Sequence, residues 1–198
     1  VFHPNWLGDI LFSLPSLEAL KKRYPTSHLV SIVPPPYGEL LKSQRYVDDV
    51  IAFSEKNMLD KFRLFKELRK KEWGAGFLFH RSKTRARLFK WARIPKIIGY
   101  DTKNRRHLLT EAIAEPAQPI HKMDYLLNLL EKADIPTVSR TYRLSLARET
   151  VLFPKPYIVF HPGSNWEPKR WPTKHYAKLG EMLSSAFKTH IVITGTAS

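Results

Sequence analysis

A short loop near the start of the chain carries residue types suited to group transfer. It reads Asn5-Trp6-Leu7-Gly8-Asp9 and lies between a predicted strand and a predicted helix. Gly8 permits close backbone approach or a positive φ. Asp9 presents a carboxylate that can accept a proton from an attacking hydroxyl. Because Asp is also a favoured N-cap residue, the motif alone leaves open that Asp9 only caps its helix.

A second loop has the composition of an anion-binding site. It reads His-Pro-Gly-Ser-Asn from His161 and continues to a Lys-Arg pair ahead of a predicted helix, whose first turn suits Pro172. Backbone N–H groups, a helix N-terminus and two cations together favour a diphosphate. An ordinary loop with exposed charge stays an alternative. The predicted binding residues are Gly163, Ser164, Lys169 and Arg170.

The stretch from Arg81 to Arg106 is strongly basic. Asp101 is its only acid among the cations Lys83, Arg85, Arg87, Lys90, Arg93, Lys96, Lys103 and Arg105. Arg81, Ser82 and Arg85 directly follow a predicted strand, so we expect them at the same cleft as Asn5, Gly8 and Asp9. This face is suited to a phosphorylated acceptor or an anionic membrane leaflet. The other interpretation is a solvated basic surface.

Composition narrows the class of partner without choosing one. The 198 residues carry a formal net charge of +15, with 43% hydrophobic and 12% aromatic residues. This composition excludes wholesale disorder and implies a polyanionic partner. The chain has no cysteine, and its eight histidines show no metal-ligand spacing. We expect His80, His107 and His121 to be structural or hydrogen-bonding. No Walker loop, dinucleotide glycine fingerprint or Gly-x-Ser-x-Gly elbow is present.

Short strand patterns alternate with longer helical ones, which predicts an α/β fold built from parallel βαβ units. Pro15 should kink or restart the first helix. The clearest helix is 58–73, where Leu59, Phe62, Phe65 and Leu68 recur at helical spacing. The predicted strands are 1–2, 29–33, 50–53, 76–80, 97–100, 157–161 and 190–194, and the predicted helices are 9–23, 58–73, 123–133 and 173–187.

The pattern predicts an N-terminal domain at 1–134, a linker at 135–156 and the start of a second domain at 157–198. One βαβ unit cannot bury both faces of a sheet, so we expect this second domain to be incomplete. No apolar run approaches the ~20 residues of a membrane-spanning helix. The chain starts without a signal peptide or an initiator methionine, and we expect a few residues to be missing there.

The opening motif and several later segments resemble one family. Residues 5–17, ending in the Arg-Tyr-Pro of 23–25, resemble the opening of the ADP-heptose:lipopolysaccharide heptosyltransferases (glycosyltransferase family 9), most closely its heptosyltransferase II branch. Segments 97–100, 108–110, 161–163 and 169–172 resemble that family in the same order. The resemblance implies a GT-B architecture, in which two Rossmann-like domains face each other across a cleft.

The resemblance also implies an inverting, metal-independent transfer without a cofactor. Asp9 falls on the catalytic-base position, Lys169 on the donor-phosphate lysine, and Ser164 near the hydroxyl residues that touch that phosphate. ADP-heptose is the implied donor and the phosphorylated inner core of lipopolysaccharide the acceptor, at the cytoplasmic face of the inner membrane with peripheral contact to anionic lipid. The family's adenine and ribose contacts lie beyond Ser198, so we expect the 198-residue chain alone to be inactive.

Two alternatives remain at this point. One is a non-catalytic basic α/β module that binds nucleic acid, although no recognised nucleic-acid-binding motif is present. The other is a family 9 transferase with another sugar donor or acceptor, because fold does not settle substrate.

Overall fold

The computed structural model describes residues 1–137, 139–145, 153–164 and 166–195. The chain forms two compact units, Val1–Ala147 and Arg148–Ser198. Part of the predicted linker, residues 138 and 146–152, lies outside the described residues. Of its remaining part, Ser145 belongs to the first unit, where its N–H donates to the side-chain oxygen of Gln44 at 3.1 Å.

The first unit is built on one parallel sheet. Its strands are β1 (Val30–Val33), β2 (Asp49–Ala52), β3 (Gly76–Leu78), β4 (Ile97–Tyr100) and β5 (Glu111–Ile113). Phe2 forms parallel bridges to Ile32 in β1 and to Leu78 in β3, so the order across the sheet is β2-β1-Phe2-β3-β4-β5. With Phe2 counted as the first strand, this is the Rossmann order, which reverses direction at Phe2.

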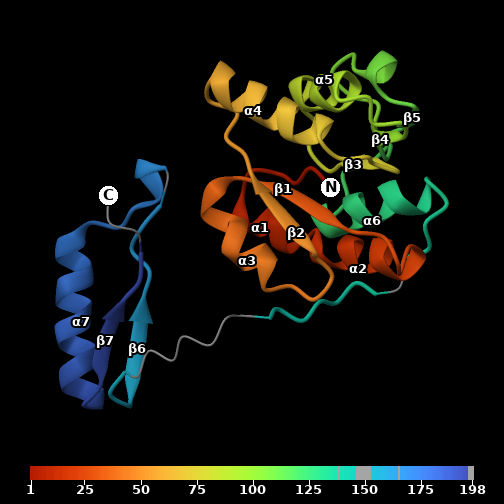
Figure 1. Cartoon of the computed structure of the whole chain (residues 1–198). Helices are drawn as coiled ribbons and strands as arrows, with labels where there is room; N and C mark the ends of the chain where they lie inside the picture. Colours follow the sequence, from red (N-terminus) through yellow and green to blue (C-terminus); the bar gives the residue numbers. More distant parts are fainter. Residues whose placement is uncertain (138, 146–152, 165, 196–198) are drawn as a thin grey trace. The chain divides into compact units, whose positions relative to one another are not determined.

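Helices cover both faces of this sheet because alternate strand residues point to opposite sides. On one face, α4 (Met58–Arg69) and α5 (Lys83–Trp91) pack on Phe2, Ile32 and Leu78. On the other, α2 (Leu14–Arg23) and α6 (Lys122–Glu131) pack on Phe77 and Phe79 (Figure 1). The shorter elements of this unit are α1 (Leu7–Leu11), η1 (Pro35–Tyr37), α3 (Gly38–Lys42) and η2 (Arg106–Leu108).

The structure confirms most predicted elements and corrects several. Pro15 restarts the helix: α1 ends at Leu11, and α2 begins at Leu14 with Pro15 in its first turn. Helices α3 and α5 and strand β5 were not predicted. The helix predicted at 58–73 ends at Arg69, and its apolar pattern was misleading, because Leu59 and Phe62 are exposed. Leu64 and Leu68 are buried in the core, and Phe65 packs against it partly buried.

The second unit is a single βαβ unit, as predicted. Strands β6 (Tyr157–Phe160) and β7 (His190–Ile193) are parallel, and α7 (Thr173–Phe187) packs beside them (Figure 1). A Cβ on Gly180 of α7 would lie 3.6 Å from both Phe160 and Ile191. The short helix η3 (Glu167–Lys169) precedes α7.

One glycine is required by the packing of α5 on the sheet. A Cβ on Gly76 would come within 2.6 Å of two ring carbons of Phe89, which is buried and cannot swing aside. We expect Gly76→Ala to lower the free energy of unfolding by about 1–3 kcal/mol, the usual cost of overpacking a core. Urea denaturation followed by circular dichroism measures it. Gly74→Ala is the matched control, because nothing lies within 4 Å of its Cβ. Equal stability of the two variants would contradict this account.

Candidate active site

The carboxyl ends of the strand of Phe2 and of β3 lie next to each other at the point where the strand order reverses. Ligands of open α/β sheets bind outside this point. The loop 3–9 leaves the sheet after Phe2, and the loop 79–82 leaves it after β3. The structure therefore brings the two loops predicted for the first unit to one edge of the sheet.

Asp9 does not cap its helix. The N-cap of α1 is Trp6, whose side chain makes no capping hydrogen bond, and Asp9 is the third residue inside the helix. Its side chain is half-buried, and no hydrogen-bond or ion-pair partner is found for its carboxylate among the described residues. Gly8 has helical rather than positive φ, and a Cβ there would meet nothing within 4 Å. The carboxylate and the open space beside Gly8 are thus available to a substrate.

Arg85 supports the loop 3–9, which leads to Asp9. Its guanidinium is buried over the ring of Phe2, 4.5 Å from the ring centroid. Its Nη1 donates to the His3 carbonyl at 2.6 Å, and Nη2 donates to Oδ1 of Asn5 at 2.5 Å. Its third nitrogen, Nε, donates to Glu55 at 3.1 Å. Each guanidinium nitrogen thus has a protein partner, and Arg85 is a positioning residue.

Glu55 links Ser82 to Arg85, which in turn holds the loop 3–9, and sequence reasoning missed Glu55. One carboxylate oxygen accepts from Arg85 and the other from the Ser82 hydroxyl at 3.1 Å. The Ser82 hydroxyl also accepts from the Arg85 N–H at 3.4 Å, which caps α5. The available signal was weak: Glu55 is an acid just after the carboxyl end of β2.

His3 fixes the junction between α1 and α2. Burial lowers its pKa well below 6.5, so the ring is neutral at pH 7. The Ser13 hydroxyl gives its proton to the Ile10 carbonyl at 2.6 Å, so His3 Nδ1 must donate to Ser13 Oγ at 2.9 Å. Its Nε2 therefore accepts from Ser31 at 3.1 Å. This chain of bonds ties α1, which carries Asp9, to β1.

A second buried arginine lies under the other loop. Arg105 donates to the His80 carbonyl at 2.6 Å and to the Tyr100 carbonyl at 2.9 Å. Burial lowers its pKa to about 10, which leaves it charged at pH 7. Arg81 is exposed and pairs with Glu115 at 2.8 Å. Arg105 thus links the carboxyl ends of β3 and β4 from inside the fold, and Arg81 is the exposed cation beside them.

Two of the three singled-out histidines accept hydrogen bonds from the backbone, as expected. His80 Nδ1 accepts the Ser82 N–H at 3.0 Å, and burial lowers the pKa of its ring to about 4. His121 caps α6 by accepting the Met123 N–H at 3.2 Å. In the described part of the chain, no group of three histidine or carboxylate side chains is placed to hold a metal ion.

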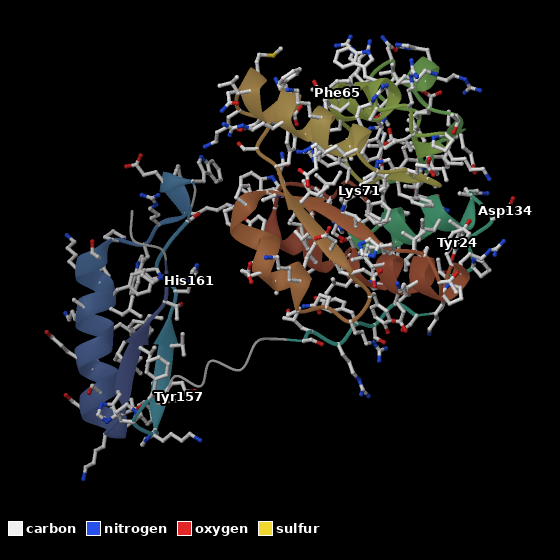
Figure 2. The ribbon with its side chains drawn as sticks, in the orientation of Figure 1. Tyr24, Phe65, Lys71, Asp134, Tyr157 and His161 are labelled. Atoms are coloured by element: carbon white, nitrogen blue, oxygen red, sulfur yellow. The ribbon has the colours of Figure 1, made fainter. Side chains whose placement is uncertain are left out.

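The second predicted loop lies in the second unit, after β6. His161, labelled in Figure 2, follows that strand and pairs with Thr194 at 3.1 Å. The Arg170 Nε donates to the Ser164 carbonyl at 2.6 Å, which closes the loop, and Lys169 is exposed with its ammonium 5.4 Å from the Trp166 ring centroid. Asn165 lies outside the described residues.

The remaining predictions for this loop concern Gly163 and Pro172. Gly163 has open space where a Cβ would stand. Pro172 is the N-cap of α7 and not a residue of its first turn. Ser164 itself accepts the Trp166 N–H on its hydroxyl at 3.3 Å.

A cavity of about 740 Å³ lies elsewhere, at the amino ends of the strands. Val1, Leu29, Trp73, Phe77 and Lys96 are among its lining residues. The predicted site residues of the first unit stand at the opposite edge of the sheet. The candidate site is therefore identified by its residue types and not by the volume of a cavity.

The Arg85 contacts predict a stability effect with a matched control. Arg85→Met removes two charge-assisted hydrogen bonds to the loop and leaves Glu55 without its cation. We expect a loss of about 2–3 kcal/mol in unfolding free energy. The contribution of the Glu55 ion pair to this figure is discounted, because Glu55 is partly exposed. Arg87→Met, at an exposed position of the same helix, should cost under about 0.5 kcal/mol.

Hydrogen exchange separates a local role of Arg85 from a global one. Amides of residues 5–10 should exchange faster in Arg85→Met under conditions where the sheet amides stay protected. Unchanged protection of that loop would show that Arg85 does not position it.

Comparison with known proteins agrees with this architecture. The family model of glycosyltransferase family 9 (heptosyltransferase) matches residues 61–198. Lipopolysaccharide heptosyltransferase 2 of Salmonella typhimurium is 27% identical over 205 residues, which cover 92% of this chain and 59% of that protein. The chain thus spans 59% of the length of this curated relative.

Two solved structures share the fold. The glycosyl transferase family 9 structure from Veillonella parvula has a TM-score of 0.79 at 18% identity, covering 98% of this chain and 61% of that one. E. coli ADP-heptose lps heptosyltransferase II has a TM-score of 0.73 at 24% identity, covering 99% and 63%. The predicted fold class, α/β of GT-B type with a Rossmann-like N-terminal domain, is confirmed. With its Rossmann sheet and the family match over residues 61–198, this chain belongs to glycosyltransferase family 9, the heptosyltransferase family.

Proposed function

We propose that this chain is part of an enzyme that transfers heptose from ADP-heptose to the phosphorylated inner core of lipopolysaccharide. The observation that carries the proposal is the Asp9 carboxylate, which has no partner among the described residues and stands at the switch point of a Rossmann sheet. Family membership gives the reaction class, and relatives named heptosyltransferase 2 support the sugar and the acceptor.

Asp9 is the general base in this proposal. It accepts the proton of an acceptor hydroxyl while that oxygen attacks the anomeric carbon from the face opposite the leaving group, which inverts the configuration. Positive charge spreads over the sugar ring as the bond to ADP lengthens. Asn5 and Gly8 shape the space beside the base, and Arg85 with Ser82 keeps the loop in place.

The second unit supplies the charge for the leaving group. Negative charge develops on the departing ADP, and Lys169 and Arg170 stabilise it with the N–H groups around Gly163 and Ser164. Because these cations neutralise the diphosphate, the proposed transfer uses no metal ion and no cofactor. Arg81, exposed beside Glu115, is the proposed contact for an acceptor phosphate. We place the reaction at the cytoplasmic face of the inner membrane, where the acceptor lipid lies.

A transfer assay tests the proposal. A form of the protein with a complete donor domain should add one heptose to an inner-core acceptor, detected by mass spectrometry, with inversion at the anomeric carbon. Transfer from another nucleotide sugar but not from ADP-heptose would refute the assigned donor. We expect no turnover from the 198-residue chain alone, since its second unit has one βαβ unit with Tyr157 and Val159 exposed. Measurable turnover would contradict that expectation.

A further inference from the structure

Helix α4 carries large apolar side chains on the face turned away from the core. Its buried residues are Leu64 and Leu68. Met58, Leu59 and Phe62 are 75%, 68% and 53% exposed, in the first two turns of the helix. Single exposed apolar residues are normal on proteins, but three neighbours on one helix form a patch that needs an explanation.

Cations continue the same solvent-facing side of α4 toward its C-terminus. Arg63, Lys66, Arg69 and Lys70 are exposed, and the Lys66 ammonium stands 4.6 Å from the centroid of the Phe62 ring. Between residues 56 and 71 there are seven lysines and arginines and two acids. At 3.6 residues per turn, the exposed apolar and cationic residues share one side, opposite Leu64 and Leu68. Figure 2 labels Phe65 in the middle of this helix.

A shallow cavity accompanies these cations. It has a volume of about 470 Å³ and is lined by Arg63, Lys66, Glu67, Lys70 and Lys71. Lys71 pairs with Asp49 at 3.1 Å, and the other three cations still outnumber the one carboxylate, which suits a phosphate-bearing headgroup more than a neutral ligand. An apolar patch for acyl chains and a cationic hollow for headgroups therefore lie along one helix.

We propose that α4 docks on an anionic phospholipid bilayer, with Met58, Leu59 and Phe62 inserted at the interface and the following cations on lipid phosphates. Helices that combine bulky apolar residues with lysine and arginine bind membranes in this way. The solvent side of α4 has the charge complementary to anionic lipid. No helix in the described part of the chain has the length and apolar character to cross a bilayer.

The docking surface adjoins the candidate active site. Helix α4 begins shortly after Glu55, which bonds Ser82 and Arg85 at the carboxyl edge of the sheet. Docking through the first turns of α4 would keep that edge near the bilayer surface. The benefit for a lipid-linked acceptor rests on the proposed function, but the docking itself does not.

Vesicle sedimentation with the whole chain tests the surface. The wild type should bind phosphatidylglycerol–phosphatidylcholine vesicles and not vesicles of phosphatidylcholine alone. Lys66→Glu/Lys70→Glu should bind at least about tenfold more weakly, because each cation near an anionic surface contributes a several-fold factor. The matched control is Arg23→Glu/Lys132→Glu, with the same charge change on α2 and next to α6, on the other face of the sheet. It should bind nearly as the wild type does.

The apolar patch is tested separately. Leu59→Ser/Phe62→Ser should lower vesicle binding by about tenfold at any salt concentration, whereas Ile120→Ser/Met182→Ser, which also removes two exposed apolar side chains, should not. Because the chain has no cysteine, Leu59→Cys gives one attachment point for a polarity-sensitive dye. Its emission should shift to the blue on anionic vesicles, and that of a dye on Ile120→Cys should not.

Several results would overturn the docking surface. One is that the α4 variants bind anionic vesicles as the wild type does, and another is that the emission of the dye at position 59 does not shift. The others are equal binding of the wild type to neutral and anionic vesicles, and a preference of the wild type for duplex nucleic acid over vesicles. Loss of self-association in place of vesicle binding would instead show that a second copy covers the patch. The readout is lipid binding, so failure here leaves heptose transfer untouched, and failure of heptose transfer leaves vesicle binding untouched.

Discussion

Replacing Asp9 by asparagine is expected to lower kcat for heptose transfer by about 10²–10⁴-fold, the usual contribution of a positioned general base. Asparagine keeps the shape of the side chain but cannot accept the proton. The N-cap of α1 is Trp6, so the change removes no cap. The KM for ADP-heptose should therefore change little. Steady-state kinetics with ADP release as the readout measure both constants, in a form of the protein with a complete donor domain.

Asp134→Asn is the matched control for this substitution. Asp134 is exposed at positive φ after α6, a conformation that asparagine also tolerates. We expect kcat and the unfolding free energy of this variant to equal those of the wild type. If Asp9→Asn and Asp134→Asn have the same kcat, Asp9 is not the base.

Lys169→Ala is expected to lower kcat by about 10²–10³-fold, the loss seen when one preorganised group is removed from a developing negative charge. Lys169 is exposed at the end of η3, and among the described residues its ammonium contacts only the Trp166 ring. The fold therefore does not depend on its ammonium, and circular dichroism should be unchanged. Lys169→Arg keeps the charge and should recover part of the lost rate.

Lys178→Ala is the control for the loss of one exposed lysine nearby. It lies in the second turn of α7, outside the Ser164–Arg170 loop, and should keep wild-type kcat and ADP-heptose KM. Isothermal titration with ADP adds a second test, because Lys169→Ala should weaken ADP binding and Lys178→Ala should not. Equal ADP affinity and equal kcat in both variants would remove Lys169 from the donor site.

Local sequence patterns predicted the elements whose apolar residues recur at the regular spacing of a helix or a strand. The strand 97–100, which is buried throughout, has the predicted bounds, and so does the helix 173–187, although that helix has no buried residue in this chain. Helix α5 was missed because its cations dominate the composition. It is held by Ala86, Leu88 and Phe89 against the sheet, contacts that only the fold supplies. The same limit applies to α4, where Leu59 and Phe62 recur at helical spacing but are exposed.

For the site, the sequence by itself determined the chemical groups: an acid after the first strand, a basic segment after the fourth, and a Gly-Ser loop followed by Lys169 and Arg170. These follow from residue type and from the order of strands and loops. Only the tertiary structure decided which of these groups are hydrogen-bonded within the protein and which are available to a ligand. Arg85 and Glu55 are 30 residues apart, and their pairing turns a presumed ligand contact into the support of the Asp9 loop. The physical reason is that burial and hydrogen bonding are properties of neighbours in space, and neighbours so distant in sequence leave no local pattern.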